Sequence, residues 1–220
     1  MCAVRDRPRG HRTRRRASRP PRRLPLSQTA LNSLCRELRA ELRRDARGPG
    51  VAALLTRYAE REEDWRDYVF FDDAGYTRNL AHRCDEFELL LLAWQEGHES
   101  PIHCHDGQRC WMAVLEGKME ERHYREPVPG VQAPLVAGEV RRFEQGRVAF
   151  IEDEIALHSI RPAPRTRGVS LHLYARAIDQ CRVFDPETGA STLREVGYYS
   201  VRGERTERPA AEIRAEWAGS

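Results

Sequence analysis

The stretch Gly97-His98-Glu99-Ser100-Pro101-Ile102-His103-Cys104-His105 is followed by Asp106-Gly107, Cys110 and Gly117. Successive side chains of a strand point to opposite faces, so we expect His103 and His105 to project the same way and Cys104 the other way. Two neutral imidazoles on one strand form half of a metal site, because imidazole suits Fe, Zn, Cu or Ni. Alone, the pair is equally consistent with two surface histidines of a hairpin.

Two further segments add candidates to this pair. His158 lies in Ala156-Leu157-His158-Ser159-Ile160 and supplies a third imidazole. In Ser170-Leu171-His172-Leu173-Tyr174 the alternation predicts that Ser170, His172 and Tyr174 share one face of a strand. Three imidazoles without a carboxylate would leave a bound dipositive metal with its full charge, which suits an incoming thiolate.

These motifs resemble the cysteine dioxygenases, which are thiol dioxygenases of the cupin superfamily. The glycine–HxH–glycine spacing is similar to the first cupin motif, with Cys110 where most cupins have a glutamate ligand, a replacement typical of the eukaryotic-type members. The second cupin motif is looser, since Gly146 and His158 are present but its usual proline, glycine and asparagine are not. The resemblance runs from Leu26 to Ser200, through the segments Tyr76–Leu80, Trp94, Gly97-His98, Leu115–Gly117, Ser170–Tyr174, Asp179–Asp185 and Thr188-Gly189.

The resemblance implies an Fe(II)-dependent enzyme that adds both atoms of O2, its co-substrate, to the thiol of free L-cysteine and gives cysteine sulfinate. It implies that His103, His105 and His158 hold one iron per chain. It also implies that Arg78 binds the substrate carboxylate, for which the planar guanidinium fork is suited. Members that act on 3-mercaptopropionate carry glutamine at the position of Arg78, so the arginine favours cysteine.

A second set of roles comes from the same resemblance. Family members with this pattern join the residues matching Cys110 and Tyr174 by a thioether crosslink, which would fix the phenol for catalysis. The alternative is a small buried side chain beside a core tyrosine. Ser170 and His172 are expected to support the Tyr174 hydroxyl, which can donate a hydrogen bond toward substrate or oxygen.

The remaining candidates concern the pocket around the metal. Tyr76 and Trp94 are expected to form a wall of the substrate pocket, and Cys181 to lie near its mouth, with ordinary core packing as the alternative for each. Cys104 is expected to face away from the metal. No activating base for it is identifiable nearby in the sequence, so a cysteine–histidine hydrolase is a weak alternative.

The pattern of the chain predicts a mainly β fold, a small jelly-roll-type cupin barrel with N-terminal helices packed on one side. Helices are expected within residues 27–66, beginning near Ser27 and carrying an apolar stripe that includes Leu31, Leu34 and Leu38. The barrel is expected over residues 76–200, so that residues 26–200 form one thiol dioxygenase domain. Residues 201–220 are expected to be a C-terminal tail. The expected strands are Thr77–Ala81, Phe87–Trp94, Ile102–His105, Cys110–Glu116, Lys118–Tyr124, Val140–Phe143, Val148–Ile151, Ala156–Ile160, Val169–Tyr174 and Cys181–Phe184.

The net charge of +3 over 220 residues conceals an asymmetry. Residues 1–25 hold ten arginines and one acidic residue, a net charge of +9, so the rest of the chain carries −6. We expect residues 1–25 to be a disordered extension, with a nucleic-acid-binding arm or a transit peptide as alternatives. The acidic body argues against nucleic acid as the main partner.

The composition also bounds the compartment. No apolar run is long enough to cross a bilayer, and the six cysteines show no CxxC spacing, so we expect a soluble, cytoplasmic protein with reduced thiols and no membrane partner. A monomer acting on a small molecule is expected. Two other functions remain open: a dioxygenase of another small thiol such as 3-mercaptopropionate, and a non-catalytic cupin that binds a metal or ligand as a regulator. A zinc isomerase is disfavoured because position 110 lacks a glutamate.

Overall fold

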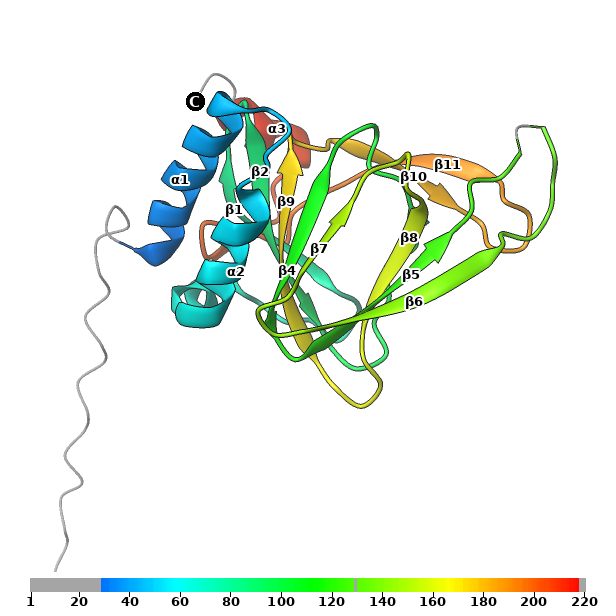
Figure 1. Cartoon of the computed structure of the whole chain (residues 1–220), viewed down its shortest axis with the longest axis horizontal. Helices are drawn as coiled ribbons and strands as arrows, with labels where there is room; N and C mark the ends of the chain where they lie inside the picture. Colours follow the sequence, from blue (N-terminus) through cyan, green and yellow to red (C-terminus); the bar gives the residue numbers. More distant parts are fainter. Residues whose placement is uncertain (1–28, 129, 218–220) are drawn as a thin grey trace, which may run out of the picture.

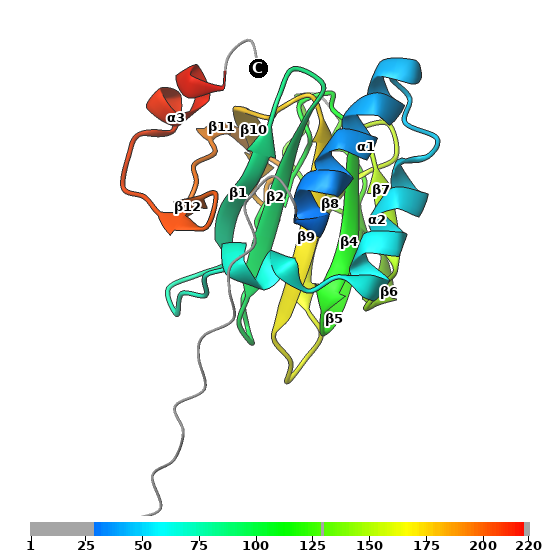
Figure 2. The same ribbon diagram turned by 90° about the vertical axis from the view of Figure 1, so that its left-hand side faces the viewer.

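A computed structural model describes residues 29–128 and 130–217 of the chain. Two β-sheets face each other and enclose a barrel, and two helices cover the outer face of one sheet (Figures 1 and 2). The expected mainly β, jelly-roll-type cupin barrel with N-terminal helices on one side is therefore confirmed. The arginine-rich extension 1–25 and the proposed cap residue Ser27 lie outside the described residues.

The described helices are α1 (Ala30–Arg44), α2 (Val51–Arg61), the 3-10 helix η2 (Asp64–Tyr68) and α3 (Ala210–Glu216). The first sheet has the order β13 (Glu204–Arg205), β12 (Ser200–Val201), β1 (Thr77–Arg83), β2 (Phe87–Trp94), β9 (Gly168–Ala175), β4 (Cys110–Glu116) and β7 (Val148–Ile151). The second has the order β11 (Ser191–Glu195), β10 (Gln180–Phe184), β3 (Ile102–His103), β8 (Leu157–Pro162), β5 (Lys118–Tyr124) and β6 (Ala137–Glu144).

The sequence of strand β2 is almost continuously apolar, and its packing explains why. Leu89 and Leu91 pack with the helices in one apolar cluster, whereas Leu90, Leu92 and Trp94 pack in a second cluster inside the barrel. Every residue of the strand is buried, because both faces of this sheet are covered. The even-numbered residues of β2 thus face the barrel interior, as do those of β4 and β9 around Met112 and Tyr174.

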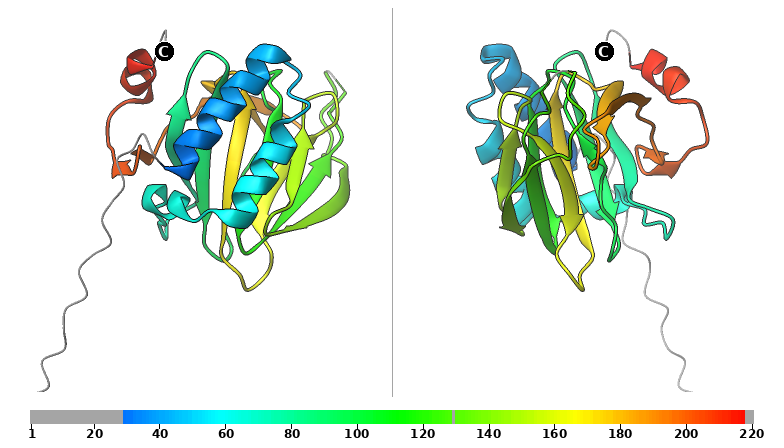
Figure 3. Two further views of the ribbon diagram at one scale, coloured as in Figure 1. Left: turned by 60° about the vertical axis from the view of Figure 1, so that its left-hand side comes forward. Right: turned by 90° about the vertical axis from the view of Figure 1, so that its right-hand side faces the viewer.

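The helices supply the outer cover of the first sheet, as Figure 3 shows. Helix α1 begins after Thr29, whose Oγ1 accepts a hydrogen bond from the Asn32 N–H at 3.2 Å. Its stripe Leu31, Leu34, Cys35, Leu38 and Leu42 is buried, as predicted. Within the described residues, no helix has both the length and the apolar character required to cross a membrane.

A glycine is required where β4 turns into β5. Gly117 has a φ of +78°, and a Cβ at this position would lie 2.3 Å from the carbonyl oxygen of Arg167. A side chain would therefore collide with backbone that cannot move cheaply, and the left-handed conformation would add strain. This explains the glycine in the segment Leu115-Glu116-Gly117.

The expected C-terminal tail, residues 201–220, differs from what the structure shows over residues 201–217. Strands β12 and β13 form a hairpin whose first strand pairs in parallel with β1. Helix α3 then packs on the barrel through Ile213 and Trp217, which are 1% and 5% exposed. Residues 218–220 lie outside the described residues. This segment lacks the strong apolar pattern of the long strands. Two buried apolar side chains are enough to dock the short helix, so its sequence carries little sign of the packing.

The expected strands Phe87–Trp94, Cys110–Glu116, Lys118–Tyr124 and Val148–Ile151 have the observed bounds. The strand expected at Ile102–His105 ends at His103, because the chain turns at Asp106 and Gly107, which have positive φ values of 54° and 74°. Strand β11 and the C-terminal hairpin were not expected.

Candidate metal and substrate site

Three histidines converge at the wall of the barrel interior. His103 is on β3, His158 is directly opposite it on β8, and His105 follows β3 in the turn. One ring nitrogen from each lies within 4.8 Å of the others, and the Nε2 atoms of His103 and His158 are 3.2 Å apart. The ring centroid of His105 lies 5.3 Å from that of His103 and 4.6 Å from that of His158. The predicted convergence of the HxH pair with His158 is therefore present, although His105 is beyond the end of the strand.

Polar groups behind two of these rings orient them. Glu121 is 1% exposed, and its Oε1 lies 2.9 Å from His158 Nδ1. The Pro101 carbonyl oxygen lies 2.9 Å from His103 Nδ1. Both contacts engage Nδ1 and so direct the Nε2 atoms into the cluster.

Asp153 is the corresponding group beside His105. Its carboxylate accepts hydrogen bonds from the backbone N–H groups of His105 at 2.6 Å and Gly107 at 2.7 Å, and its Oδ1 lies 3.4 Å from His105 Nδ1. Both ring nitrogens of His105 are buried without a hydrogen-bond partner among the described residues. Buried polar atoms without partners are uncommon in native proteins, so this ring has the features of a metal ligand.

Burial keeps the imidazoles of His103 and His158 neutral. It lowers the pKa of His103 to about 3, with the neighbouring His105 adding to the effect. Burial also lowers the pKa of His158 well below its ordinary range. A neutral imidazole offers a lone pair on nitrogen, which is the form that binds a metal.

Cys110 and Tyr174 lie side by side on the interior face of the first sheet. They are directly opposite each other in the antiparallel pair β4–β9, a position at which Cβ atoms are about 4.5–5.5 Å apart. Burial is the main cause that raises the pKa of both the thiol and the phenol. Both groups are therefore protonated at neutral pH.

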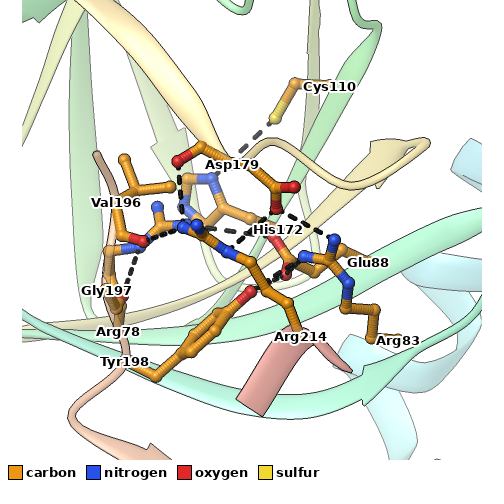
Figure 4. Close-up of polar contacts among 10 residues, drawn as sticks. All are labelled: Arg78, Arg83, Glu88, Cys110, His172, Asp179, Val196, Gly197, Tyr198 and Arg214. Atoms are coloured by element: carbon orange, nitrogen blue, oxygen red, sulfur yellow. Dashed lines mark hydrogen bonds and ion pairs between the residues drawn. The ribbon is translucent and has the colours of Figure 1, made fainter. Parts of the chain in front are cut away.

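Ser170 and His172 occupy the same inward face of β9 as Tyr174. The Ser170 hydroxyl lies 2.9 Å from His172 Nε2 and accepts a hydrogen bond from Trp94 Nε1 at 2.9 Å. His172 Nδ1 lies 3.9 Å from the sulfur of Cys110 (Figure 4). The predicted contact between Ser170 and His172 is present. The other ring nitrogen of His172 faces Cys110, and among the described hydrogen bonds none joins His172 to the Tyr174 hydroxyl.

A cavity of about 40 Å³ lies beside the histidines. The remaining predicted substrate residues meet here: Arg78 and Tyr76 line the cavity together with Tyr174, His103 and His105. Trp94 lies behind Tyr76, with the two rings stacked at 4.5 Å and an interplanar angle of 17°, so it supports the wall without lining it.

Both predicted cysteines of this region also border the cavity. Cys181 lines it, as expected for a residue near its mouth. Cys104 packs in a separate apolar cluster with Ile102, Leu157 and Phe184, yet it also contributes to the cavity wall. The expectation that Cys104 faces away from the histidines is thus met only in part, because the chain leaves the regular strand after His103.

Sequence reasoning missed two buried carboxylates near the site, Glu121 and Glu88, and the half-buried carboxylate of Asp153. Glu121 and Asp153 contact His158 and His105, and Glu88 is fully buried behind Arg78, with one carboxylate oxygen 3.9 Å from its guanidinium. Glu121 follows Glu120, and Asp153 lies in Glu152-Asp153-Glu154, so each belongs to a local acidic run typical of a surface. The burial of Glu88 could have been predicted, because it is a single charge within the apolar run Phe87–Trp94.

A cupin barrel with three inward histidines beside an arginine-walled cavity defines a cupin protein whose site could hold a metal. A sequence profile of the family described as "Cysteine dioxygenase type I" matches residues 23–187. The chain is 33% identical over 158 residues to "Cysteine dioxygenase type 1" of Danio rerio, covering 71% of this chain and 79% of that protein. The protein of the same name from Homo sapiens is 34% identical over 158 residues, covering 71% and 78%.

The chain therefore belongs to the cysteine dioxygenase type I family, as its sequence motifs predicted, and it is an enzyme. A solved protein with a double-stranded β-helix domain from Klebsiella pneumoniae matches with a TM-score of 0.43 at 15% identity, covering 62% of this chain and 98% of that chain. This structural likeness is too low to bear on function.

Proposed function

We propose that the chain is an Fe(II)-dependent dioxygenase that adds both atoms of O2 to the thiol of free L-cysteine and gives cysteine sulfinate. The observation that carries this proposal is the convergence of three imidazoles, two of which, His103 and His105, line a small cavity together with Arg78. Family membership supports the reaction.

His103, His105 and His158 would hold the iron, one per chain. The unpartnered ring nitrogens of His105 and the short Nε2–Nε2 separation of the other two fit such a role, since an unprotonated ring nitrogen has a lone pair that a bound cation would satisfy. Imidazole is a suitable ligand for iron. When bound, Fe(II) supplies the redox chemistry that a thiol and O2 need in order to react.

Arg78 would bind the carboxylate of the substrate. Its guanidinium lines the same cavity as His103 and His105, and its Nη2 is buried without a hydrogen-bond partner among the described residues. A carboxylate accepts paired hydrogen bonds from this planar group. A small substrate could present its carboxylate to Arg78 and its thiol toward the histidines, since both border the same cavity.

Tyr174 would donate a hydrogen bond to an oxygen atom in the cavity. Burial raises the pKa of its phenol and Arg78 offsets part of this effect, so the hydroxyl keeps its proton at neutral pH. A thioether between Cys110 and Tyr174 would fix the ring in this position, and their direct opposition on neighbouring strands supports it. His172, in contact with Ser170, would hold Cys110 and so act indirectly on the phenol.

The test is oxygen uptake by Fe(II)-loaded protein given L-cysteine or 3-mercaptopropionate, with the product identified by mass. We expect uptake with L-cysteine and one sulfinate formed per O2 consumed. The variant Arg78→Gln should raise the KM for L-cysteine at least about tenfold, because a charge-assisted pair is lost. Arg182→Gln is the matched control, since Arg182 is exposed on β10 next to Cys181.

The outcomes separate the alternatives. Uptake with 3-mercaptopropionate alone would retain the chemistry and contradict the proposed substrate. No uptake with either thiol, while iron is bound in full, would contradict the proposed reaction and favour a non-catalytic binding protein.

A further inference from the structure

A network of ion pairs adjoins Arg78 (Figure 4). We call Glu88, Arg83, Asp179 and Arg214 the buried ion network, after the buried Glu88; Asp179, at its outer end, is 47% exposed. These residues come from β2, the end of β1, the loop before β10 and helix α3. Glu88 is at its centre, fully buried on the inward face of β2.

Two donors hold one oxygen of Glu88, and the network then continues outward. Arg83 Nη1 donates to Glu88 Oε1 at 3.0 Å, and the Tyr198 hydroxyl donates to the same oxygen. Arg83 Nη2 lies 2.9 Å from Asp179 Oδ1, and Arg214 Nε lies 3.0 Å from that oxygen. Each charged group thus has a partner of opposite sign, which is the condition for burying charges without a large penalty.

The second oxygen of Glu88 faces Arg78. Glu88 Oε2 and Arg78 Nη2 are 3.9 Å apart, and both atoms are buried without a hydrogen-bond partner in the described part of the chain. Arg78 Nε donates to the Gly197 carbonyl at 3.2 Å. The guanidinium is therefore fixed by one hydrogen bond on one side and attracted by one carboxylate from behind.

Helix α3 secures the segment that makes this hydrogen bond. Arg214 Nη2 donates to the carbonyl oxygens of Asp179, at 2.9 Å, and of Val196. Val196 precedes Gly197 and itself lines the cavity. The segment whose Gly197 carbonyl accepts the hydrogen bond from Arg78 is thus held in place by an arginine of the C-terminal helix.

The ion pairs of this group leave Arg78 the least engaged of its cations. Arg83 pairs with Glu88 and Asp179, and Arg214 pairs with Asp179 and, at 3.7 Å, with Glu195. Among the described ion pairs, Arg78 faces only Glu88, at 3.9 Å, and it is the cation of this set that lines the cavity.

We propose that the buried ion network positions Arg78 for the substrate carboxylate, with Glu88 and Arg214 acting as positioning residues that do not touch the substrate. This inference rests on the proposed function and extends it. It assigns part of substrate recognition to the C-terminal helix, whose sequence contains no residue of the site itself. Glu88 restrains the direction of the guanidinium, and Arg214 restrains the backbone that accepts its hydrogen bond.

The experiment compares Glu88→Gln and Arg214→Gln with the parent protein. Anaerobic calorimetry of Fe(II)-loaded protein measures the affinity for L-cysteine and for 2-aminoethanethiol, which has the same thiol and amine but no carboxylate. We expect Glu88→Gln to weaken L-cysteine binding about tenfold and Arg214→Gln about threefold, by analogy with residues that orient ligands from outside a site. Affinity for 2-aminoethanethiol should remain within twofold of the parent value, taking about twofold as the limit of significance.

Two further measurements make the result independent of folding and of the proposed reaction. The Nε–H proton of Arg78, followed by NMR in the absence of thiol, should exchange faster with solvent in both variants. Glu116→Gln is the matched control, because Glu116 is also held by two arginines, Arg66 at 2.7 Å and Arg167 at 3.0 Å, but lies at the other end of β4 from Cys110. It should leave both the resonance and the affinities unchanged.

The inference is overturned if both variants bind L-cysteine as tightly as the parent, or if the two thiols lose affinity equally. It is also overturned if the Arg78 resonance is unaffected. If Glu88→Gln does not fold, Arg214→Gln alone decides. If the parent protein does not bind L-cysteine, the proposed function fails, while the Arg78 resonance still decides whether the network positions the guanidinium.

Discussion

Replacing Glu121 by glutamine should weaken metal binding without unfolding the protein. The Glu121 carboxylate is 1% exposed and lies 2.9 Å from His158 Nδ1 through one oxygen and 3.2 Å from His123 Nε2 through the other. Glutamine has the same shape and keeps one oxygen that can accept from His158. The change therefore removes a charge and leaves a neutral hydrogen bond in its place.

The magnitude follows from that difference. A hydrogen bond to a charged group contributes about 1 kcal/mol more than a neutral one, which corresponds to roughly a fivefold to tenfold change in an equilibrium constant. Loss of an outer partner of a ligating histidine costs about 10- to 100-fold in metal affinity in comparable sites. We therefore expect about a tenfold loss, at the lower end of that range, because the amide oxygen still orients the ring.

The assay is a competition titration of Fe(II) between the protein and a chelator of known affinity. Glu120→Gln is the matched control, because Glu120 is the neighbouring residue of β5, is 3% exposed and binds Arg142 and Arg161, both at 2.9 Å. We expect Glu120→Gln to leave iron affinity unchanged. Equal affinity in Glu121→Gln and the parent protein would refute the role of Glu121, and an equal loss in both variants would show a general effect of charge.

Three further predictions follow from the same structure. If the thioether between Cys110 and Tyr174 forms, the intact mass of the active protein should be two hydrogen atoms below the sequence mass, and Cys110→Ser should abolish the deficit. The pKa of His172 is lowered from 6.5 to about 3, chiefly by burial, so the unfolded chain binds more protons in this window. The free energy of unfolding of the metal-free protein should therefore decrease as pH falls from 6.5 toward 3, with a shallower slope in His172→Gln, as urea titrations at several pH values would show. Ile213→Ala should lower the free energy of unfolding by about 2–4 kcal/mol, because this side chain of α3 is almost fully buried, whereas a freely mobile tail would predict no change.

The strands and the three histidines could be predicted from the sequence because their signals are local. Alternation over two or more residues fixes the face of a side chain, and a glycine such as Gly117 marks a turn that tolerates no other residue. The register that places Cys110 opposite Tyr174 was reached only through the family resemblance. Alternation identifies a face and cannot identify a neighbour on another strand.

The placement of the carboxylates could not be predicted, because it depends on partners that are distant in the sequence. Glu88 pairs with the nearby Arg83 but also accepts a hydrogen bond from Tyr198, 110 residues away, and Asp153 reaches His105 from 48 residues away. Helix α3 escaped prediction for a related reason. Its charged residues are typical of an exposed segment, and the contacts of Arg214 that fix it, with Asp179 and Val196, become visible only in the folded chain.

In the proposed site the position of these carboxylates would favour an anionic substrate. A carboxylate among the ligands would cancel one charge of a dipositive metal and repel an incoming thiolate. Glu121 instead contacts His158 Nδ1, and Asp153 accepts from the backbone N–H of His105, so neither would be a direct ligand. Glu88 stands in a similar relation to Arg78, because it lies behind the guanidinium that is proposed to bind the substrate carboxylate. A thiolate and a carboxylate entering together would therefore meet the bound metal and Arg78, with the protein's own anions one layer further out.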